Sequence, residues 1–232
     1  MTFSIVGLCK ESNQIGICTV SASISHGGHC PFISTMVGAV ITQARTNSFH
    51  GPHILEMMGK GIHPKVALDA SLRSDENFEY RQVGALNWEG EGAAFTGRST
   101  RDWKGHVIGQ DFVACGNLVV GEQVVNAISE SFRNSAGMPL ARRLMDAIAA
   151  GQGAGGELGG PHSAALLLDT NQRNPMWPIA VDLRIDWAQD AIQSLRAAYE
   201  EWIAHVGRLK EEPITKYYPL TSNIGMDGAL IY

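Results

Sequence analysis

The sequence lacks the features that mark membrane, secreted and nucleic-acid-binding proteins. Its 232 residues contain no apolar run near the roughly 20 residues that a membrane helix needs. The first residues hold neither the basic segment nor the apolar stretch of a secretory signal. The 18 basic residues are outnumbered by 23 acidic ones and form no basic stripe, so neither nucleic acid nor a membrane surface is an expected partner. We expect a cytoplasmic protein.

Cysteine is scarce, and its spacing argues against the usual cross-links. The four cysteines lie far apart and form no C-x-x-C pair: Cys9, Cys18, Cys30 and Cys115. Neither a disulfide framework nor a thiolate zinc site is therefore indicated. His26, His29 and Cys30 form an H-x-x-H-C cluster, but in a loop this spacing fixes no common ligand geometry. We expect no metal and no cofactor, and keep a loop-bound zinc hydrolase at these three residues as a weaker alternative.

Two common functional patterns are also missing. No G-x-S-x-G sequence is present, which removes the commonest layout of a serine hydrolase. Gly151, Gly153 and Gly156 match G-x-G-x-x-G, but a predicted helix precedes them and a predicted strand follows. A dinucleotide-binding motif needs the reverse order, because the N-terminus of the helix holds the phosphates. We interpret these glycines as a turn that ends a helix.

The pattern of apolar residues predicts one α+β domain over residues 1–232, with an irregular tail at about 210–232. The predicted strands are Thr2–Cys9, Ile15–Ser23, Met36–Thr42, Tyr80–Trp88, Ala93–Thr96, Asp111–Cys115, Ser163–Leu168 and Ile179–Ile185. The predicted helices are Pro52–Gly59, Pro64–Arg73, a segment around Val124–Phe132, a segment around Leu140–Ile148, and Ala188–Arg208. No repeat or low-complexity linker indicates a boundary, and the alternating blocks favour stacked layers.

The start of the chain holds the strongest candidate for a catalytic group. If Met1 is removed, as often happens before a small residue, Thr2 presents a hydroxyl beside its own α-amine. An α-amine titrates near ~7.7–8.0, so a useful fraction is neutral at pH 7 and can act as the base for the hydroxyl. This is the threonine variant of nucleophile activation. The plainer alternative is that Thr2 is a β-branched residue that begins a strand.

Strand pairing is expected to bring more hydroxyl groups to Thr2. If the first two predicted strands form a hairpin, Thr2 lies opposite Ala22 or Ser23. Ser21 and Ser23 then flank the nucleophile, and Ser4 shares its face because side chains alternate along a strand. The spacing therefore predicts a cluster of hydroxyl groups at one edge of a sheet.

Short motifs from Thr2 to about Asp186 carry a resemblance to a known family. They are Thr2-Phe3-Ser4-Ile5-Val6, Val37-Gly38-Ala39-Val40-Ile41-Thr42-Gln43, Arg81-Gln82-Val83-Gly84, Thr96-Gly97, Trp103-x-Gly105-His106, Gly116-Asn117-Leu118, Pro139-Leu140-Ala141-x-Arg143-Leu144, Ala154-Gly155-Gly156 and Ser163-Ala164-Ala165. Together they resemble the domain of unknown function 1028 family, an uncharacterised bacterial family grouped with the N-terminal-nucleophile (Ntn) hydrolases. The fold that this implies is a four-layer αββα sandwich, with two antiparallel sheets packed face to face and helices on both outer sides.

The resemblance implies a catalytic set. Thr2 is the implied nucleophile, and the hairpin spacing, not the resemblance, adds Ser21 and Ser23 beside it. Asn117 and the backbone of Gly116 are the implied oxyanion hole, because acyl transfer needs an amide donor aimed at the developing negative charge.

The resemblance also implies residues that contact the substrate. Arg81, Gln82 and Gln43 are implied to line a pocket. For Arg81 and Gln82 the alternative is a buried network that ties strands together. His106 is a candidate for general acid–base catalysis or substrate contact, with a structural histidine as its alternative.

The loop before Ser163 departs from the family pattern. Where the family usually has Asp, a basic residue, Arg, Gly and then Gln, this chain has Glu157-Leu158-Gly159-Gly160 and His162. A guanidinium and an aspartate are missing, which puts their substrate contacts in doubt. The first lysine after Lys10 is Lys60, so proteasome-type activation by a lysine is not supported. The serine cluster or the α-amine must activate Thr2 instead.

These observations predict an amidohydrolase of the Ntn class that cleaves a small amide or peptide-like substrate through an acyl–Thr2 ester. The activity requires loss of Met1, because an N-terminal nucleophile cannot use its α-amine while Met1 remains. The alternative is a non-catalytic binding or scaffolding protein that keeps the fold and its cleft with Met1 attached. The sequence leaves association into a homo-oligomer open.

Overall fold

The computed structural model describes residues 1–171 and 180–211. Within these residues the chain forms two antiparallel sheets and five α-helices, so the predicted α+β class is confirmed. None of the described helices combines the length and apolar content needed to cross a lipid bilayer. Most of the predicted tail at about 210–232 lies outside the described residues, as does the start of the predicted strand Ile179–Ile185.

The larger sheet has six strands and the smaller sheet has four. The larger sheet has the order β10-β9-β2-β1-β8-β7, with β1 Thr2–Cys9, β2 Gln14–Ser21, β7 Lys104–Gly109, β8 Phe112–Asn117, β9 Ser163–Thr170 and β10 Val181–Ile185. The smaller sheet has the order β3-β4-β5-β6, with β3 Pro31–Ser34, β4 Gly38–Ala44, β5 Arg81–Asn87 and β6 Gly92–Thr96. The start of the chain therefore lies inside the larger sheet, between two neighbouring strands.

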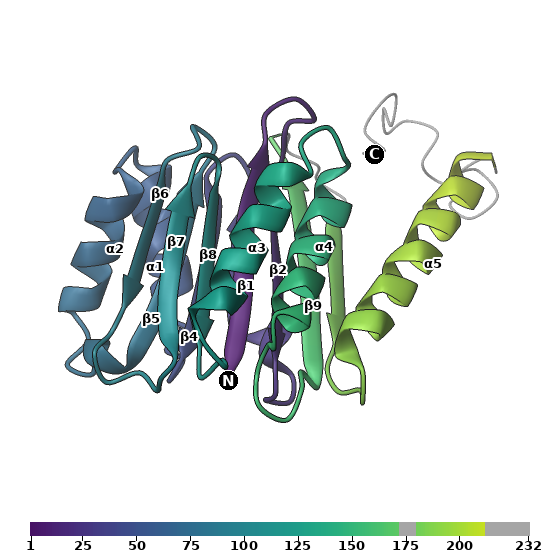
Figure 1. Ribbon diagram of the computed structural model, residues 1–232. Helices are drawn as coiled ribbons and strands as arrows, with labels where there is room; N and C mark the ends of the chain where they lie inside the picture. Colours follow the sequence, from purple (N-terminus) through teal and green to yellow (C-terminus); the bar gives the residue numbers. More distant parts are fainter. Residues whose placement is uncertain (172–179, 212–232) are drawn as a thin grey trace.

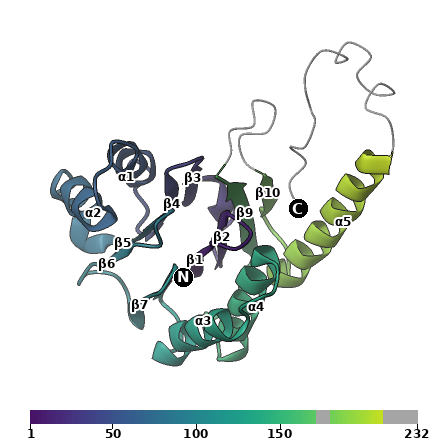
Figure 2. The ribbon, with the colours of Figure 1, turned by 90° about the horizontal axis from the view of Figure 1, so that it is seen from above.

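Helices lie on the outer side of each sheet (Figures 1 and 2). The helices are α1 His50–Gly59, α2 Pro64–Arg73, α3 Glu122–Asn134, α4 Leu140–Gly153 and α5 Ala191–Glu211. α1 and α2 pack on the four-stranded sheet, α3 and α4 pack on the six-stranded sheet, and α5 contacts β9 and β10. The inner faces of the two sheets pack on each other through a separate apolar cluster.

Strand β1 shows how alternation builds these layers. Phe3 and Ile5 point to the layer of α3 and α4 and join its apolar cluster. Val6 and Leu8, which occupy the alternate positions, join the apolar cluster between the sheets. Thr2 shares the inter-sheet face of Val6 and Leu8, so its hydroxyl is turned toward the other sheet.

Two strands and one register differ from the predictions. β3 and β7 were not expected, because each is an edge strand with a weak pattern: β3 has four residues and begins at Pro31, and β7 contains two glycines. The β1–β2 hairpin pairs Thr2 with Ser21, not with Ala22 or Ser23. The turn is shorter than expected because Asn13 adopts a left-handed conformation, φ 51°, and β2 begins at the next residue.

Candidate functional site

Thr2 lies between two strand ends that bring polar groups to it. In the β1–β2 pair Thr2 faces Ser21, and in the β1–β8 pair it faces Asn117. Directly opposed residues of antiparallel strands point to the same face, so all three side chains meet at this edge. The Oγ1 atom of Thr2 is 3.1 Å from Oγ of Ser21, which confirms the predicted proximity of the two hydroxyls. Ser23 is exposed and contributes a backbone N–H, which donates to Oγ of Ser21 at 3.1 Å.

Met1 occupies the position next to both hydroxyls. Its carbonyl oxygen accepts hydrogen bonds from Oγ1 of Thr2 and Oγ of Ser21, both at 2.6 Å. Burial lowers the pKa of the Met1 α-amine, the charge of Glu157 opposes this change, and the charge of Arg101 adds to it. With Met1 attached, the hydroxyl of Thr2 is therefore engaged by a carbonyl group and not by an amine.

A buried network of amide side chains joins the site to the smaller sheet. Nε2 of Gln43 donates to Oε1 of Gln82 at 2.7 Å and to the carbonyl of Thr2 at 3.5 Å, and Oγ of Ser4 donates to Oε1 of Gln43 at 2.6 Å. Nδ2 of Asn117 donates to the same Oε1 of Gln82 at 3.0 Å. Gln43 and Gln82 therefore hold the position of Asn117 and of the Thr2 backbone.

Gln82 extends this network toward β6 and β7. Its Nε2 atom donates to the hydroxyl of Thr96 at 2.9 Å and to the carbonyl of Gly116 at 2.9 Å. The hydroxyl of Thr96 also bonds Nδ1 of His106 at 2.8 Å; His106 is exposed at the sheet edge, and partial desolvation of its ring lowers its pKa. His106 thus meets the site indirectly, through Thr96 and Gln82. Gly116 contributes its carbonyl oxygen to this network as an acceptor, and the implied role of its backbone N–H as an oxyanion donor stays a prediction.

Arg81 makes its hydrogen bonds outside the Thr2 cluster. Its guanidinium binds both carboxylate oxygens of Asp75, at 2.7 and 3.2 Å, and the carbonyl of Arg45 at 2.6 Å. Arg81, with help from Asn47 and His50, holds the pKa of Asp75 well below its usual range. These contacts match the alternative reading of Arg81, a buried network that ties elements together.

A cavity of about 420 Å³ opens beside Met1, within the size range of sites for small molecules. It is lined by Met1, Ala44, Arg45, Tyr80, Ser99, Thr100, Arg101, Asn117 and Leu118. The guanidinium of Arg45 lies over the ring of Tyr80, 5.6 Å from its centre, and the carbonyl of Arg101 accepts from the N–H of Leu118 at 3.2 Å. Arg98, on the same loop as Arg101, is paired with Glu79. Neither Arg45 nor Arg101 has a carboxylate partner in the part of the chain that the structure describes.

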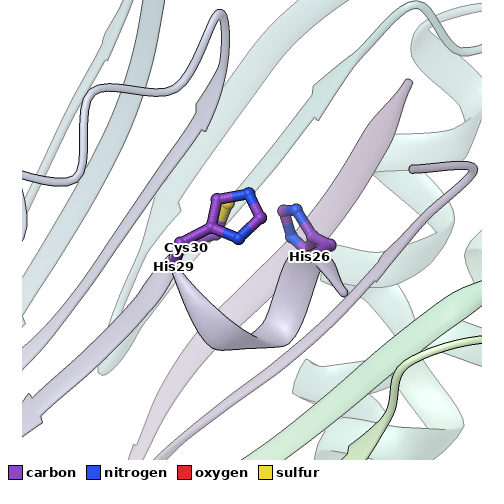
Figure 3. Close-up of side chains that lie close together, drawn as sticks. All are labelled: His26, His29 and Cys30. Carbon is purple, nitrogen blue, oxygen red and sulfur yellow. The ribbon is translucent and has the colours of Figure 1, made fainter. Parts of the chain in front are cut away.

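A second cluster has the composition of a metal site. One ligand atom from each of His26, His29 and Cys30 lies within 4.8 Å of the other two. Figure 3 shows the two imidazoles above the short turn His26–Gly28, with the Cys30 sulfur behind the ring of His29. Burial lowers the pKa of His26 to about 3 and raises the pKa of Cys30 to about 12. The loop therefore brings the three side chains together, which their spacing in the sequence did not predict.

Comparison with known proteins gives the family. A sequence model described as "Family of unknown function (DUF1028)" matches residues 2–195. The chain belongs to the DUF1028 family. The crystal structure of protein SPO2555 from Silicibacter pomeroyi, a DUF1028 protein, is similar to it with 33% sequence identity and a TM-score of 0.79, over 86% of this chain and 85% of that chain. No match was found among curated proteins.

A more distant structure adds no argument. Anbu (ancestral beta-subunit) from Yersinia bercovieri aligns with 92% of this DUF1028 chain and 98% of its own, at 10% identity and a TM-score of 0.38. This score is too low to compare folds or sites.

Glu157 lies at the site of this DUF1028 protein, although the sequence did not predict a role for it. Oε2 of Glu157 accepts from the N–H of Ala22 at 3.0 Å, while Oε1 is buried and has no hydrogen-bond partner among the described residues. Its backbone pairs with Val119, two residues after Asn117. Burial raises the pKa of Glu157 to about 7, although the Ala22 hydrogen bond and the α-amine lower it. The signal in the sequence is a lone carboxylate within the glycine-rich segment from Gly151 to Gly160.

Proposed function

We propose that this protein is an Ntn-type amidohydrolase that cleaves a small amide or peptide-like bond with Thr2 as nucleophile, after Met1 has been removed. The observation that carries this proposal is the meeting of Thr2, Ser21 and Asn117 on three adjacent strands, beside a cavity of about 420 Å³. An Ntn-like αββα sandwich is part of the proposal. Two facing sheets with helices on both outer sides support it.

The chemistry follows from the groups around Thr2. Once Met1 is lost, the nitrogen of Thr2 becomes an amine that can accept the proton of the Thr2 hydroxyl. The oxygen attacks the carbonyl carbon of the substrate, the C–N bond breaks, and the proton passes to the departing amine. Water then attacks the acyl–Thr2 ester, releasing the acid and restoring the hydroxyl.

Asn117 is the proposed donor to the developing oxyanion. A carboxamide carries two N–H bonds, and the hydrogen bond to Gln82 uses one of them. The other is available to the cavity that Asn117 lines. Because Gln82 fixes the amide before substrate arrives, little reorganisation accompanies the reaction.

The cavity favours a substrate with an anionic group. Arg45 and Arg101 both line it, and a guanidinium binds carboxylate or phosphate oxygens through paired N–H donors. The backbone of Arg45 is held by Tyr80 and Arg81, so its position relative to the site is defined. We expect the acid side of the substrate to carry a carboxylate or a similar anion.

Covalent labelling tests the proposal. Protein processed to a free Thr2 should react with a β-lactone, with the label mapping to residue 2 by peptide mass spectrometry. The form that retains Met1 and the Thr2→Ala variant should not react. Equal labelling of all three forms, or labelling at Ser21 or Cys30, would show that the nucleophile is elsewhere.

One observation favours a second candidate, a non-catalytic binding protein. The carbonyl of Met1 accepts hydrogen bonds from the hydroxyls of Thr2 and Ser21, both at 2.6 Å. In the form that retains Met1, both hydroxyl groups therefore already have hydrogen-bond partners. Intact mass of protein from its native host separates the two candidates. Quantitative retention of Met1 would support the binding protein.

A further inference from the structure

Three side chains on one short connection bring possible metal-ligand atoms close together. The connection runs from the end of β2 at Ser21 to the start of β3 at Pro31, and so passes from the larger sheet to the smaller one. His26, His29 and Cys30 each offer one ligand atom, and these atoms lie within 4.8 Å of one another (Figure 3). Ligand atoms around tetrahedral zinc are about 3.5 Å apart. A small approach of these atoms would complete that spacing, and His29, the exposed member of the three, has room to move.

Both ends of this cluster are anchored, and they are anchored to different sheets. His26 is held by the larger sheet, because its Nε2 atom bonds Oγ1 of Thr19 on β2 at 2.8 Å. Cys30 is held by the smaller sheet, because its carbonyl accepts from the N–H of Thr42 on β4 at 2.9 Å. A hydrogen bond from one ring nitrogen orients a histidine so that the other nitrogen can bind a metal. The other ring nitrogen of His26 has no hydrogen-bond partner in the described parts of the chain.

We propose that His26, His29 and Cys30 bind one zinc-class divalent cation, which clamps the connection between the two sheets. Two imidazoles and a thiolate suit zinc and exclude magnesium and calcium, which take oxygen ligands. Water would be the fourth ligand. Binding forms a metal–sulfur bond, and the thiol proton of Cys30 leaves to solvent.

Metal titration of the full chain tests the site, using zinc alone and then cobalt as a spectroscopic probe. We expect one zinc per chain by equilibrium dialysis and elemental analysis, and a cobalt–thiolate charge-transfer band. His29→Ala removes a proposed ligand and should weaken zinc binding at least about 100-fold. Thr19→Val removes only the hydrogen-bond partner of His26, and should weaken zinc binding roughly 10–100-fold. His29 is exposed, so this variant should keep the fold. Cys30→Ser should abolish the charge-transfer band.

Matched controls use residues away from the cluster. His205→Ala changes an exposed histidine on α5, and Cys9→Ser changes a half-buried cysteine on β1. Both should bind zinc as the unmodified protein does, and zinc should raise the unfolding temperature of both but not of His29→Ala. Zinc binding that His29→Ala leaves unchanged, or cobalt binding without the thiolate band, would overturn the proposal. Protein that retains Met1 suffices for every arm, so the outcome is independent of the proposed hydrolase activity.

Discussion

The space between the two sheets has two halves that are built on the same strands. Toward the β1–β2 turn, the facing side chains are mainly apolar: Val6, Leu8, Ile15, Ile17, Ala39, Ile41 and Leu86. At the start of β1 they are polar: Thr2, Ser4, Thr19, Ser21, Gln43, Gln82 and Asn117. Both halves are buried, so solvent access does not explain the difference. At the start of β1 the strands therefore bury less apolar surface, and oriented hydroxyl and amide groups occupy these positions instead.

The two halves of the inter-sheet space are stabilised by different interactions. In the apolar half, stability comes from filled volume, so removing atoms leaves a cavity. In the polar half, each buried group must find a partner, because an unsatisfied one costs about 1–3 kcal/mol. Gln82 illustrates this dependence, since its single side chain bonds Gln43, Thr96 and Asn117. Substitutions in the apolar half should therefore change stability, whereas a substitution in the polar half should change stability only where it leaves a buried group without a partner or a buried charge, and should change function where the group faces the cavity.

Removing volume from the apolar half should give the largest effect. Ile17→Ala truncates a fully buried side chain, and we expect the free energy of unfolding to fall by about 2–5 kcal/mol. Urea unfolding at fixed pH measures this change. Under conditions in which this variant is still folded, a β-lactone should label its processed Thr2 at the same rate as in the unmodified protein. A loss of stability well below this range would show that the sheets repack, and that the apolar half is less rigid than inferred.

Removing the proposed oxyanion donor should slow catalysis. The expected rise in the activation free energy is nearly as large as the loss of unfolding free energy in Ile17→Ala. Asn117→Ala is expected to lower turnover by on the order of 10²–10³. Oε1 of Gln82 keeps its hydrogen bond from Gln43, so stability should fall by only about 1 kcal/mol. Turnover and urea unfolding are measured on the same preparation.

Asn87→Ala is the matched control for Asn117→Ala. Asn87 is also a buried asparagine at a strand end, but it bonds Glu91 in a turn remote from Thr2. Its replacement should leave turnover unchanged. A loss of turnover in Asn87→Ala equal to that in Asn117→Ala would mean that both act through folding.

The sequence indicates the polar edge because that signal is local. Along β2, the inter-sheet face changes from Ile15 and Ile17 to Thr19 and Ser21, and alternation alone reveals it. The register was wrong by one or two residues, because the left-handed conformation of Asn13 sets the turn, and the polar run Lys10–Gln14 holds several residues at which the turn could have been placed.

Contacts between the sheets carry no local signal. Gln43 and Gln82 lie on different strands of the smaller sheet and meet Thr2 and Asn117 of the larger sheet only in three dimensions. Arg81 stands next to Gln82 in sequence, yet it points to Asp75, because neighbouring residues of a strand face opposite sides. Its role therefore could not be separated from that of Gln82 by sequence alone.

Ionisation of Glu157, at the polar edge of the larger sheet, should make the stability of the protein depend on pH. Burial raises the pKa of Glu157 from its ordinary 4.5 to about 7, so between these values the folded state holds a proton that the unfolded state has lost. The stabilising contribution is present below pH 4.5 and is lost as pH rises through about 7. Relative to Glu157→Gln, we expect the protein to lose roughly 3 kcal/mol between pH 4 and pH 8.

Urea unfolding at several pH values measures this difference for Glu157. Glu122→Gln, at an exposed residue that begins α3, is the control and should show no such change with pH. A constant difference between Glu157→Gln and the unmodified protein would mean that the pKa of Glu157 is the same in the folded and unfolded states, so that burial does not raise it.

The smallest effect is expected at the rim of the cavity, where the arginines are exposed and water screens their charge. Arg45→Gln and Arg101→Gln should each slow labelling of processed Thr2 by a carboxylate-bearing β-lactone by about 10-fold, near the lower end for a charge-assisted hydrogen bond. Labelling by a neutral β-lactone of similar size should stay unchanged, because the polar half that activates Thr2 is intact. Arg98→Gln is the control, since Arg98 lies on the same loop but is paired with Glu79. Equal slowing with both lactones would mean that the arginines help to position Thr2 and do not bind the carboxylate. If neither lactone reacts more slowly, the proposal that the substrate carries an anionic group is wrong.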